Sequence, residues 1–444
     1  MTRRYFGTDG IRGVANQLLT ADLALAAGRA AVAALNQKQP RILIGRDTRI
    51  SGPMLEAALV AGICSAGGQA VLAEVIPTPA VASLVVSESL DAGVVISASH
   101  NPYRDNGVKF FGPSGFKLTD AQETEMESFL SRAGSFTPAP EPGPVRRIAG
   151  PGERYVDNVL SHFDIDLSGL KLILDCAHGA TWETAPMALR RLGAEVTVVC
   201  ARPDGFNINE GCGSTNIHTL QEKVRNDGFD AGFAFDGDGD RVIAVDSRGE
   251  VVDGDFIMAI CAKHLKQKGK LKKDTVVTTV MTNLGFHLAM KELGIRLLTT
   301  AVGDRYVLEE MLAGGYNLGG EQSGHIIYLK TGTTGDGLAT ALLLLEVMTD
   351  SGQPLDELAR IMTRFPQKLV NVQVENMEEL RHAREIWDQV DEETARLGNE
   401  GRVLVRASGT EPVVRVMVEA ETAGICDDVS SRIVAVVEKT LGTV

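Results

Sequence analysis

The chain contains 444 residues, and 44% of them are hydrophobic. This length and composition are typical of about three or four folded domains and exclude a disordered chain. The net charge of −14 argues against nucleic acid and anionic membranes as partners, because both attract basic surfaces, so an anionic substrate would have to meet a local cluster of cations.

The cysteines and the first residues indicate the compartment. Six cysteines are scattered without Cys-x-x-Cys spacing, a pattern typical of reduced thiols rather than of a zinc site or a disulfide framework. Residues 1–13 lack the apolar core of a signal peptide, and no stretch approaches the length of a membrane span. We therefore expect a cytoplasmic protein with no membrane or nucleic acid partner.

The hydrophobic pattern predicts three α/β units and a smaller final domain. From residue 41, short apolar runs alternate with alanine-rich helical stretches, which favours largely parallel sheets. Five prolines indicate an extended connector at 134–152, and the alternation resumes at 171 and again at 255. Beyond Phe365 and Pro366, strands combine with a charged helix over 377–397, as in an α+β domain. The predicted domains span 1–150, 151–252, 253–365 and 366–444.

The most informative motif is Asp-Gly-Asp-Gly-Asp-Arg at 236–241, directly after an apolar run that ends at Phe235. Three carboxylates at alternate positions would repel one another without a cation, and hard oxygen ligands suit Mg²⁺. The preceding strand would hold them at its carboxyl end, where open α/β sheets usually bind ligands. The alternatives are a solvated acidic turn and a calcium loop, although the EF-hand pattern needs a distal glutamate that this segment lacks. We expect one Mg²⁺ ion, with Asp236, Asp238 and Asp240 as its ligands.

A second loop, Ser-Ala-Ser-His-Asn-Pro at 97–102, carries a candidate nucleophile. It also follows a buried run, so Ser99 can act as a nucleophile or carry a phosphate. His100 could orient or deprotonate this serine, and Lys109 places a cation ten residues further along the chain. Taken alone, the segment favours an ordinary turn.

Two later loops offer donors and acceptors for a sugar phosphate. In the segment 319–325, Glu321 and Ser323 are natural contacts for sugar hydroxyls, whereas His325 taken singly is more typical of a structural histidine. The segment 406–412 offers guanidinium, hydroxyl and backbone donors to a phosphate; an arginine at a strand end followed by a Ser-Gly turn is the alternative. The cations that these loops could gather around an anion are Arg12, Arg46, Lys109, Arg241, Arg305 and Arg406.

Five motifs in this order resemble the α-D-phosphohexomutase superfamily from end to end: Phe-Gly-Thr-Asp-Gly-Ile-Arg-Gly at 6–13, the motifs at 97–102 and 236–241, Gly-Glu-Gln-Ser-Gly-His at 320–325, and Arg-Ala-Ser-Gly-Thr-Glu-Pro at 406–412. Five motifs at this spacing are far more specific than any one of them. Within the superfamily, the first motif, Gln322 and residues 302–307 are most similar to the branch that acts on glucosamine phosphates. Two departures are His178, where the superfamily more often has Asn, and Ala407, where it often has Pro.

The resemblance implies three successive α/β domains with mixed, mainly parallel sheets and a C-terminal α+β domain of TATA-box-binding-protein-like shape, around a central cleft. It also implies a role for each motif. Ser99 would be the phosphoserine, and one of its phosphate oxygens would complete the Mg²⁺ site. The residues around the transferred phosphoryl group would be Arg12, His100, Lys109 and Arg241. Glu321 and Ser323 would contact the sugar hydroxyls, and His325 would be a candidate proton carrier. The distal phosphate would be held by Arg406, Ser408, Gly409, Thr410 and Arg415.

The implied reaction interconverts glucosamine 6-phosphate and glucosamine 1-phosphate through phosphoserine and a 1,6-bisphosphate, and it supplies UDP-N-acetylglucosamine synthesis. A hexosamine or glucose 1,6-bisphosphate would act as the primer, a phosphorylated hexosamine would be the substrate, and a homodimer is the expected assembly. The alternatives are a phosphoglucomutase or phosphomannomutase of the same superfamily, a metal-dependent phosphatase with a serine nucleophile, and a non-catalytic protein that binds sugar phosphate or Ca²⁺. A phosphatase would more typically use two metals and clustered histidines, which the eight scattered histidines do not offer.

Overall fold

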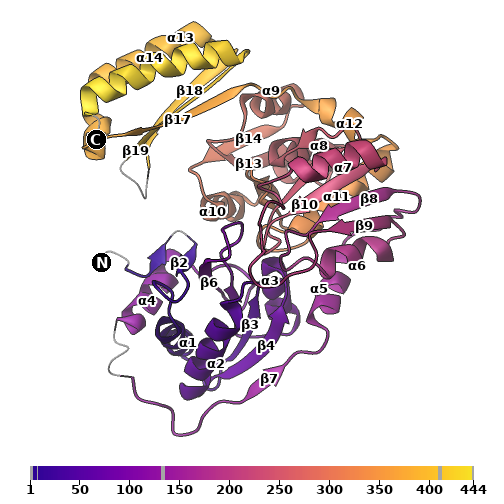
Figure 1. The fold of residues 1–444 in the computed structure, drawn as a ribbon, viewed down its shortest axis with the longest axis vertical. Helices are drawn as coiled ribbons and strands as arrows, with labels where there is room; N and C mark the ends of the chain where they lie inside the picture. The colour runs from indigo at the N-terminus through magenta and orange to yellow at the C-terminus, as the bar shows by residue number, and fades with distance from the viewer. Residues whose placement is uncertain (1–3, 8, 132–135, 409–412, 443–444) are drawn as a thin grey trace. The chain divides into compact units, whose positions relative to one another are not determined.

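The structure is a computed structural model that describes residues 4–7, 9–131, 136–408 and 413–442 (Figure 1). The chain forms two compact units. The larger unit comprises Met1–Val280 and Ile295–Arg360, and the smaller one comprises Met281–Gly294 and Ile361–Val444.

The first sheet of the larger unit is mixed, with the strand order β1-β2-β6-β5-β3-β4-β7 among the described residues. Strands β3, β4, β5 and β7 pair in parallel, whereas β6, β2 and β1 continue the sheet antiparallel. The strands are β1 (Phe6–Gly7), β2 (Gly10–Val14), β3 (Arg41–Arg46), β4 (Gln69–Val75), β5 (Ala92–Ile96), β6 (Asp105–Phe111) and β7 (Val145–Arg147). The helices of this region are α1 (Ala21–Leu35), α2 (Gly52–Ser65), α3 (Thr78–Ser87) and α4 (Asp120–Leu130).

The proline-rich connector differs from its prediction in one respect. It contains β7, which pairs with β4 and extends the edge of the first sheet. An edge strand tolerates nearby prolines because one side of it needs no hydrogen-bond partner. All residues of β7 are exposed, which explains why no hydrophobic pattern marked it.

The second sheet has the order β12-β11-β10-β8-β9, counted over the described chain. Strands β9, β8 and β10 are parallel, and β10 turns back antiparallel into β11. The turn between β10 and β11 is the acidic motif at 236–241, which therefore lies at the carboxyl end of a fully buried strand. The strands are β8 (Lys171–Asp175), β9 (Glu195–Val199), β10 (Ala231–Phe235), β11 (Val242–Asp246) and β12 (Val251–Val252), and the helices are α5 (Pro151–Leu160), α6 (Thr184–Arg191) and α7 (His218–Asp227).

The third sheet, with the order β14-β13-β15-β16 in the described segments, carries the predicted sugar loop between its antiparallel strands β15 and β16. Helix α11 is buried along most of its length, as its continuous run of leucines requires. The strands are β13 (Thr275–Thr279), β14 (Arg296–Thr300), β15 (Leu318–Gly320) and β16 (Ile326–Tyr328). The helices are α8 (Gly254–Gln267), the 3₁₀ turn η2 (Lys272–Asp274), α10 (Asp304–Gly314), α11 (Gly337–Ser351), α12 (Leu355–Leu358) and η3 (Ala359–Ile361).

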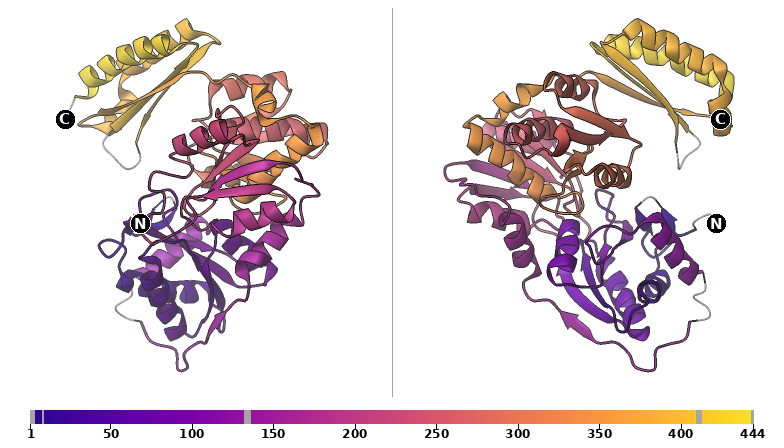
Figure 2. Two further views of the ribbon diagram at one scale, coloured as in Figure 1. Left: turned by 45° about the vertical axis from the view of Figure 1, so that its right-hand side comes forward. Right: turned by 180° about the vertical axis from the view of Figure 1, so that it is seen from behind.

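The smaller unit is an antiparallel sheet of order β17-β19-β18, over the residues that can be described, with α13 and α14 packed on one face (Figure 2). Its elements are α9 (Leu284–Glu292), β17 (Gln367–Gln373), η4 (Met377–His382), α13 (Arg384–Leu397), β18 (Gly401–Ala407), β19 (Val413–Ala420) and α14 (Ala423–Leu441). The predicted helix over 377–397 is thus divided into η4 and α13. The indole of Trp387 donates to the carbonyl of Leu380 (2.8 Å), which a continuous helix would offer to a backbone amide four residues later.

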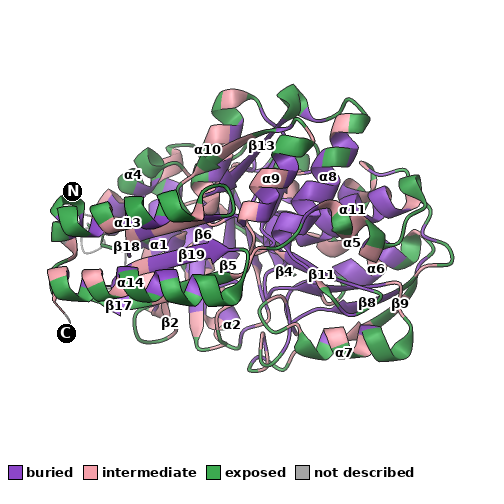
Figure 3. Ribbon diagram, turned by 90° about the horizontal axis from the view of Figure 1, so that it is seen from above, coloured by how far each residue is buried: buried purple, intermediate pink, exposed green. Residues whose placement is uncertain are grey.

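Burial follows the predicted classes of element. The central strands β8, β10 and β11 are buried, while the outer faces of α7 and α14 are exposed (Figure 3). No described helix is both long enough and apolar enough to cross a membrane. Mixed, mainly parallel sheets in the larger unit and an α+β arrangement in the smaller one confirm the predicted fold class.

Candidate active site

The acidic loop after β10 forms a buried carboxylate cluster. Asp236, Asp238 and Asp240 are at most 3% exposed, and each offers a carboxylate oxygen within 4.8 Å of the other two. The glycines permit this approach: Gly239 has φ +72°, and a Cβ on Gly237 would lie 2.6 Å from the carbonyl oxygen of Ser99. Such burial excludes the solvated acidic turn that the sequence had left open.

The chemistry of the cluster fits a hard cation. Within the described residues, Asp238 Oδ1 and Asp240 Oδ1 accept no hydrogen bond although both are buried. Burial raises the pKa of Asp236 well above its usual range, and repulsion from Asp240 and Asp238 adds to this effect. Buried, crowded carboxylate oxygens are the ligand set that Mg²⁺ prefers, so the three aspartates fit the expected ion.

Ser99 lies against this cluster. It is 1% exposed, and its hydroxyl donates a hydrogen bond to Asp236 Oδ2. Its backbone has φ +51°, an unusual conformation for a residue with a side chain, and its amide donates to Ser97 Oγ (2.9 Å). The structure therefore brings the predicted nucleophile and the predicted metal loop together across 137 positions of sequence.

Sequence reasoning missed the residue that holds the serine loop. The guanidinium of Arg49 is fully buried and donates to carbonyl oxygens of Ser99 and Asn101 (2.8 Å each) as well as to that of Asp105 (3.0 Å). Asp47 pairs with Arg49 (2.8 Å) and so offsets its charge. The segment Gly-Arg-Asp-Thr-Arg at 45–49 contains both Arg46, which the sequence placed among the cations, and Arg49, and nothing in the segment distinguishes the buried Arg49.

Lys109, on β6, is the central cation of the cluster. Its Nζ lies 3.0 Å from Asp238, 3.6 Å from Asp240 and 3.2 Å from Asp9. Burial opposes its charge, yet these carboxylates raise the pKa of Lys109, so it stays protonated. Thr78, which no motif indicated, donates to the same Asp238 oxygen (2.7 Å).

His100, Arg12 and Arg241 flank Ser99 and the aspartates. The Nδ1 atom of His100 lies 3.4 Å from the Ser99 hydroxyl, and burial, followed by the charges of Arg241 and Arg12, lowers the pKa of His100 to about 4. Arg12 is exposed on β2 and pairs with Asp9. The Nε atom of Arg241 lies 3.6 Å from Asp240 Oδ1. These three predicted residues thus share one region with the serine.

The sugar loop joins the same region through His325. This histidine is 2% exposed; Nδ1 lies 3.4 Å from Asp240 and Nε2 lies 3.6 Å from Asp304. Burial opposes protonation, but the two carboxylates raise the pKa of His325. Gly335 leaves the space for the ring, because a Cβ there would lie 2.4 Å from the ring carbon Cε1.

The two predicted sugar contacts are half-buried beside it. Glu321 accepts a hydrogen bond from the amide of Gly303 (3.2 Å), and its charge acts on Arg241. The hydroxyl of Ser323 is buried and has no hydrogen-bond partner among the described residues. The Gln322 side chain points elsewhere and donates to Asp253 (3.4 Å).

A second lysine, the half-buried Lys117, was not predicted. It pairs with Asp304 and with Asp9 (2.7 Å), and Asp9 also contacts Lys109. These ion pairs link His325 to the metal loop through alternating charges. Asp9 and Asp304 lie in the segments 6–13 and 302–307, which carry the resemblance to the superfamily. No such segment includes Lys117.

The predicted phosphate loop belongs to the smaller unit. Arg406 on β18 and Arg415 on β19 are direct cross-strand partners, and burial, followed by the charge of Arg415, lowers the pKa of Arg406. Ser408 is buried at the end of β18. Gly409 and Thr410 lie outside the described residues.

Two of the cations expected around an anion pair with carboxylates. Arg46 pairs with Glu56 (3.0 Å), and Arg305 binds Glu123 (2.6 Å) and Asp120. A place for these two arginines around an anion stays a prediction.

Comparison with known proteins identifies the family. Four family models match successive segments: phosphoglucomutase/phosphomannomutase alpha/beta/alpha domain I at 3–135, domain II at 153–249, domain III at 253–365, and the C-terminal domain at 369–436. The phosphoglucosamine mutase of Geobacillus kaustophilus is 52% identical over 445 residues, covering 99% of both chains. A phosphoglucosamine mutase of Bacillus cereus is 52% identical over 447 residues, again with 99% of both chains covered.

This chain belongs to the phosphoglucosamine mutase family.

Solved structures of other phosphohexomutases share the fold. A phosphoglucomutase/phosphomannomutase family protein of Burkholderia thailandensis superposes with a TM-score of 0.84 at 24% identity and covers 100% of this chain and 99% of its own. N-acetylphosphoglucosamine mutase of Aspergillus fumigatus, solved with GlcNAc-6P and magnesium, gives a TM-score of 0.70 at 18% identity, with 99% and 96% covered. Phosphoglucosamine mutase relatives that align along the whole chain exclude the phosphatase and the non-catalytic protein.

Proposed function

We propose that the chain interconverts glucosamine 6-phosphate and glucosamine 1-phosphate, with Ser99 as the residue that carries the phosphoryl group. One observation supports this assignment of Ser99 above others: its hydroxyl donates to Asp236 inside a buried carboxylate cluster. The reaction moves a phosphate between two distant hydroxyls, so a group stored on the enzyme must serve both positions. PhosphoSer99 gives its group to the open hydroxyl, and the resulting 1,6-bisphosphate returns its other phosphate to Ser99 after turning over.

Asp236, Asp238, Asp240 and a phosphate oxygen of Ser99 would hold one Mg²⁺ ion. When bound, the ion would neutralise carboxylate repulsion and withdraw charge from the phosphate that it contacts. The expected affinity follows from the buried carboxylate oxygens Asp238 Oδ1 and Asp240 Oδ1, which accept no hydrogen bond from described residues.

The cations around Ser99 would stabilise the charge of the phosphoryl group in transit. Lys109, held charged by three carboxylates, and Arg241 approach the loop that contacts Ser99, and Arg12 acts on the neighbouring His100. Phosphoryl transfer passes through a loose transition state with charge spread over its oxygens, so positioned cations supply most of the catalysis. The proton carrier is one of Lys109, His100 and His325.

Sugar recognition would use Glu321 and Ser323. A carboxylate can accept hydrogen bonds from two adjacent hydroxyls, and the buried Ser323 hydroxyl has no described hydrogen-bond partner. The phosphate that is not in transit would be held by Arg406, Ser408, Gly409, Thr410 and Arg415. The cross-strand pair Arg406 and Arg415 supports this role, because two adjacent guanidinium groups favour an anion between them.

The enzyme would need a hexosamine or glucose 1,6-bisphosphate as primer, since unphosphorylated Ser99 has no group to transfer. We further propose a cytoplasmic homodimer and domain boundaries at 150, 252 and 365. Light scattering should give twice the 47.4 kDa mass of one chain. A mass of one chain across the working concentration range would contradict the dimer.

The substrate is tested by parallel assays with glucosamine, glucose and mannose 6-phosphates, in the presence of Mg²⁺ and a bisphosphate primer. We expect the highest kcat/KM with glucosamine 6-phosphate. A kcat/KM that is equal or higher with glucose 6-phosphate would favour the alternative, a phosphoglucomutase of the same superfamily.

A further inference from the structure

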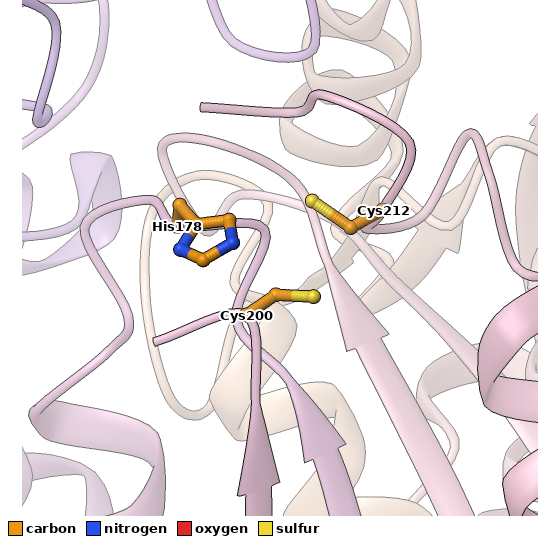
Figure 4. A group of neighbouring side chains, drawn as sticks. All are labelled: His178, Cys200 and Cys212. Atoms are coloured by element: carbon orange, nitrogen blue, oxygen red, sulfur yellow. The ribbon is translucent and has the colours of Figure 1, made fainter. Parts of the chain in front are cut away.

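A second group of metal-ligating side chains lies outside the residues assigned to the reaction. His178, Cys200 and Cys212 converge so that one ligand atom from each lies within 4.8 Å of the other two (Figure 4). His178 is in the loop after β8, Cys200 directly follows β9, and Cys212 is in the loop before α7. No sequence signature reveals the group, because its members come from three separate loops.

The position of this cluster suits a ligand. Strands β8 and β9 are parallel neighbours, so the loops after them emerge at the same edge of the second sheet. Cys212 is buried, whereas His178 and Cys200 are half-buried, which leaves an approach from solvent. All six cysteines are free thiols, so neither sulfur is committed to a disulfide.

Backbone hydrogen bonds hold the three loops together without using the sulfurs. The amide of His178 donates to the carbonyl of Cys200 (2.5 Å). The buried carboxylate of Asp175 accepts the amides of Ala177 and Gly213 (2.9 Å each) and thereby ties the loop after β8 to the loop that carries Cys212. The cluster is therefore assembled before any ligand arrives, which lowers the entropy cost of binding.

We propose that His178, Cys200 and Cys212 bind one thiophilic divalent cation of the Zn²⁺ class. Two thiolates and an imidazole are the donors that Zn²⁺ selects, and three protein ligands leave the fourth tetrahedral position to water. The aspartate cluster offers only oxygen and selects Mg²⁺ instead, so the chain would carry two metal sites of opposite preference. This inference does not depend on which residues carry the mutase reaction.

A carboxylate beside the cluster favours a cation. Asp175 is buried at the end of β8, and its oxygens accept the amides of Ala177 and Gly213 in the loops that carry His178 and Cys212. Its negative charge would help to stabilise a bound cation.

His178 should contribute less than the two thiols. Its Nδ1 atom accepts a hydrogen bond from the Arg202 amide (3.1 Å), so the neutral ring carries its proton on Nε2. Metal binding through Nε2 therefore requires this proton to move to Nδ1, with loss of the hydrogen bond from Arg202. We therefore expect the sulfurs to carry most of the affinity and the imidazole to strengthen it.

The site adjoins the loop of the aspartate cluster. Gly179, next to His178, packs so closely on Gly237 that a Cβ on Gly179 would lie 2.4 Å from the Gly237 carbonyl oxygen. The amide of Ala180 donates to that same oxygen (2.8 Å). A cation bound to His178 would therefore restrain the backbone on which the loop after β10 rests.

Cobalt(II) tests the proposal, because sulfur-to-cobalt charge-transfer absorption arises only when thiolates bind the ion. The reduced, metal-free full chain is titrated with Co²⁺ in excess Mg²⁺, and Zn²⁺ is then added. We expect one Co²⁺ per chain with thiolate charge-transfer and tetrahedral absorption, followed by bleaching as Zn²⁺ displaces it.

Variants of the cluster decide whether the signal belongs to these residues. Cys200→Ser and Cys212→Ser should each lose most of the charge-transfer absorption, and His178→Asn should keep it with weaker affinity. Cys64→Ser is the matched control, since Cys64 is also half-buried but lies in helix α2, and this variant should bind Co²⁺ like the parent chain.

If Cys212→Ser folds poorly, thermal unfolding of the other variants still tests the proposal. Zn²⁺ should raise the Tm of the parent chain and of Cys64→Ser but not that of Cys200→Ser. Because Cys200 is only half-buried, a serine in its place should not prevent folding. Charge-transfer absorption that survives in both Cys200→Ser and Cys212→Ser, or its absence from the folded parent chain, would overturn the proposal.

Discussion

Ser99 owes its position to a few buried charges. Its left-handed backbone turns the hydroxyl toward Asp236, and the Arg49 guanidinium fixes the carbonyl oxygens around that turn. A guanidinium is suited to this task because its donors are held in one plane, so it can bind several carbonyl oxygens at once. The proposed phosphoryl carrier thus depends on a side chain that is assigned no direct part in the reaction.

Replacing Arg49 with lysine should therefore slow catalysis. A single ammonium cannot reproduce the hydrogen bonds to Ser99, Asn101 and Asp105, and small displacements of a reacting group cost on the order of 10- to 100-fold in rate. Steady-state kcat measures the effect. Arg46→Lys is the control, because Arg46 pairs with Glu56 instead; an equal loss in both variants would contradict the specific role of Arg49.

The buried carboxyl group of Asp336 makes stability depend on pH. Burial raises the pKa of Asp336 to about 6, although hydrogen bonds from the Ala339 amide and the Tyr155 hydroxyl oppose the shift. Because the folded state holds this proton more tightly than the unfolded state, stability falls as pH rises from the ordinary pKa near 3.8 through about 6.

Asp336→Asn should remove this dependence while keeping the acceptor for Tyr155 and the cap of α11. Between pH 4 and pH 6.5, the free energy of unfolding of the parent chain should fall relative to the variant by about 3 kcal/mol at most, at about 1.4 kcal/mol per pKa unit. Urea unfolding across this range measures the difference. Parallel curves for the two proteins would show that Asp336 titrates normally.

Individual site residues differ in whether a local sequence pattern can reveal them. Ser99, the three aspartates and His325 lie in compact motifs, and the fold brings them together as predicted. Arg49, Thr78 and Lys117 act through contacts more than 50 positions away in most cases, so no local pattern marks them. The partners of Arg305, Asp120 and Glu123, are likewise more than 180 positions away.

Among the elements, helices α1 and α2 show how small residues set the packing of a layer. A Cβ on Gly62 of α2 would lie 2.1 Å from the carbonyl oxygen of Leu25, and a Cβ on Gly28 of α1 would lie 2.5 Å from that of Leu59. Backbone atoms cannot move aside as a flexible side chain can. The two helices are therefore in direct backbone contact.

Gly62→Ala should force these helices apart and destabilise the fold by about 1–3 kcal/mol, the usual cost of overpacking. Gly424→Ala in helix α14 is the matched control, because the nearest atom to its Cβ lies 4.0 Å away. The midpoint of urea unfolding should fall for the first variant and stay or rise for the second. Equal midpoints would contradict the close packing.

Periodicity predicted most elements within a few residues but not all of them. The parallel strands β3, β5, β8 and β10 are continuous apolar runs, which makes them easy to find. The exposed β7 has no such run, and the break before α13 depends on the bond from Trp387 to Leu380. Elements whose limits are set by tertiary contacts cannot be located from local sequence.

Across the whole molecule, a net charge of −14 coexists with a site for anionic sugars because cations are concentrated locally. Lys109 and Lys117 pair with carboxylates, and Arg12 and Arg241 accompany them. Order along the chain, more than any single motif, predicted the four-part family architecture.

Magnesium should stabilise the folded chain as a whole. Metal-free protein titrated with Mg²⁺ at constant ionic strength should gain about 2.7 kcal/mol when the ion reaches 100 times its Kd. The gain should be lost in Asp238→Asn, whose parent carboxylate has an oxygen without a donor among the described residues. A Tm that rises equally in both proteins would show that Mg²⁺ acts on general surface charge.

In the proposed reaction, Ser99 itself carries and transfers the phosphoryl group. Intact mass spectrometry in a single turnover tests it: the phosphorylated chain, purified free of primer, is mixed with excess glucosamine 6-phosphate and Mg²⁺. We expect one phosphate on the parent chain and none on Ser99→Ala, with transient loss of that phosphate as glucosamine 1,6-bisphosphate appears. Phosphate that stays on the parent chain while glucosamine 1-phosphate forms, or full activity of Ser99→Ala, would contradict the account.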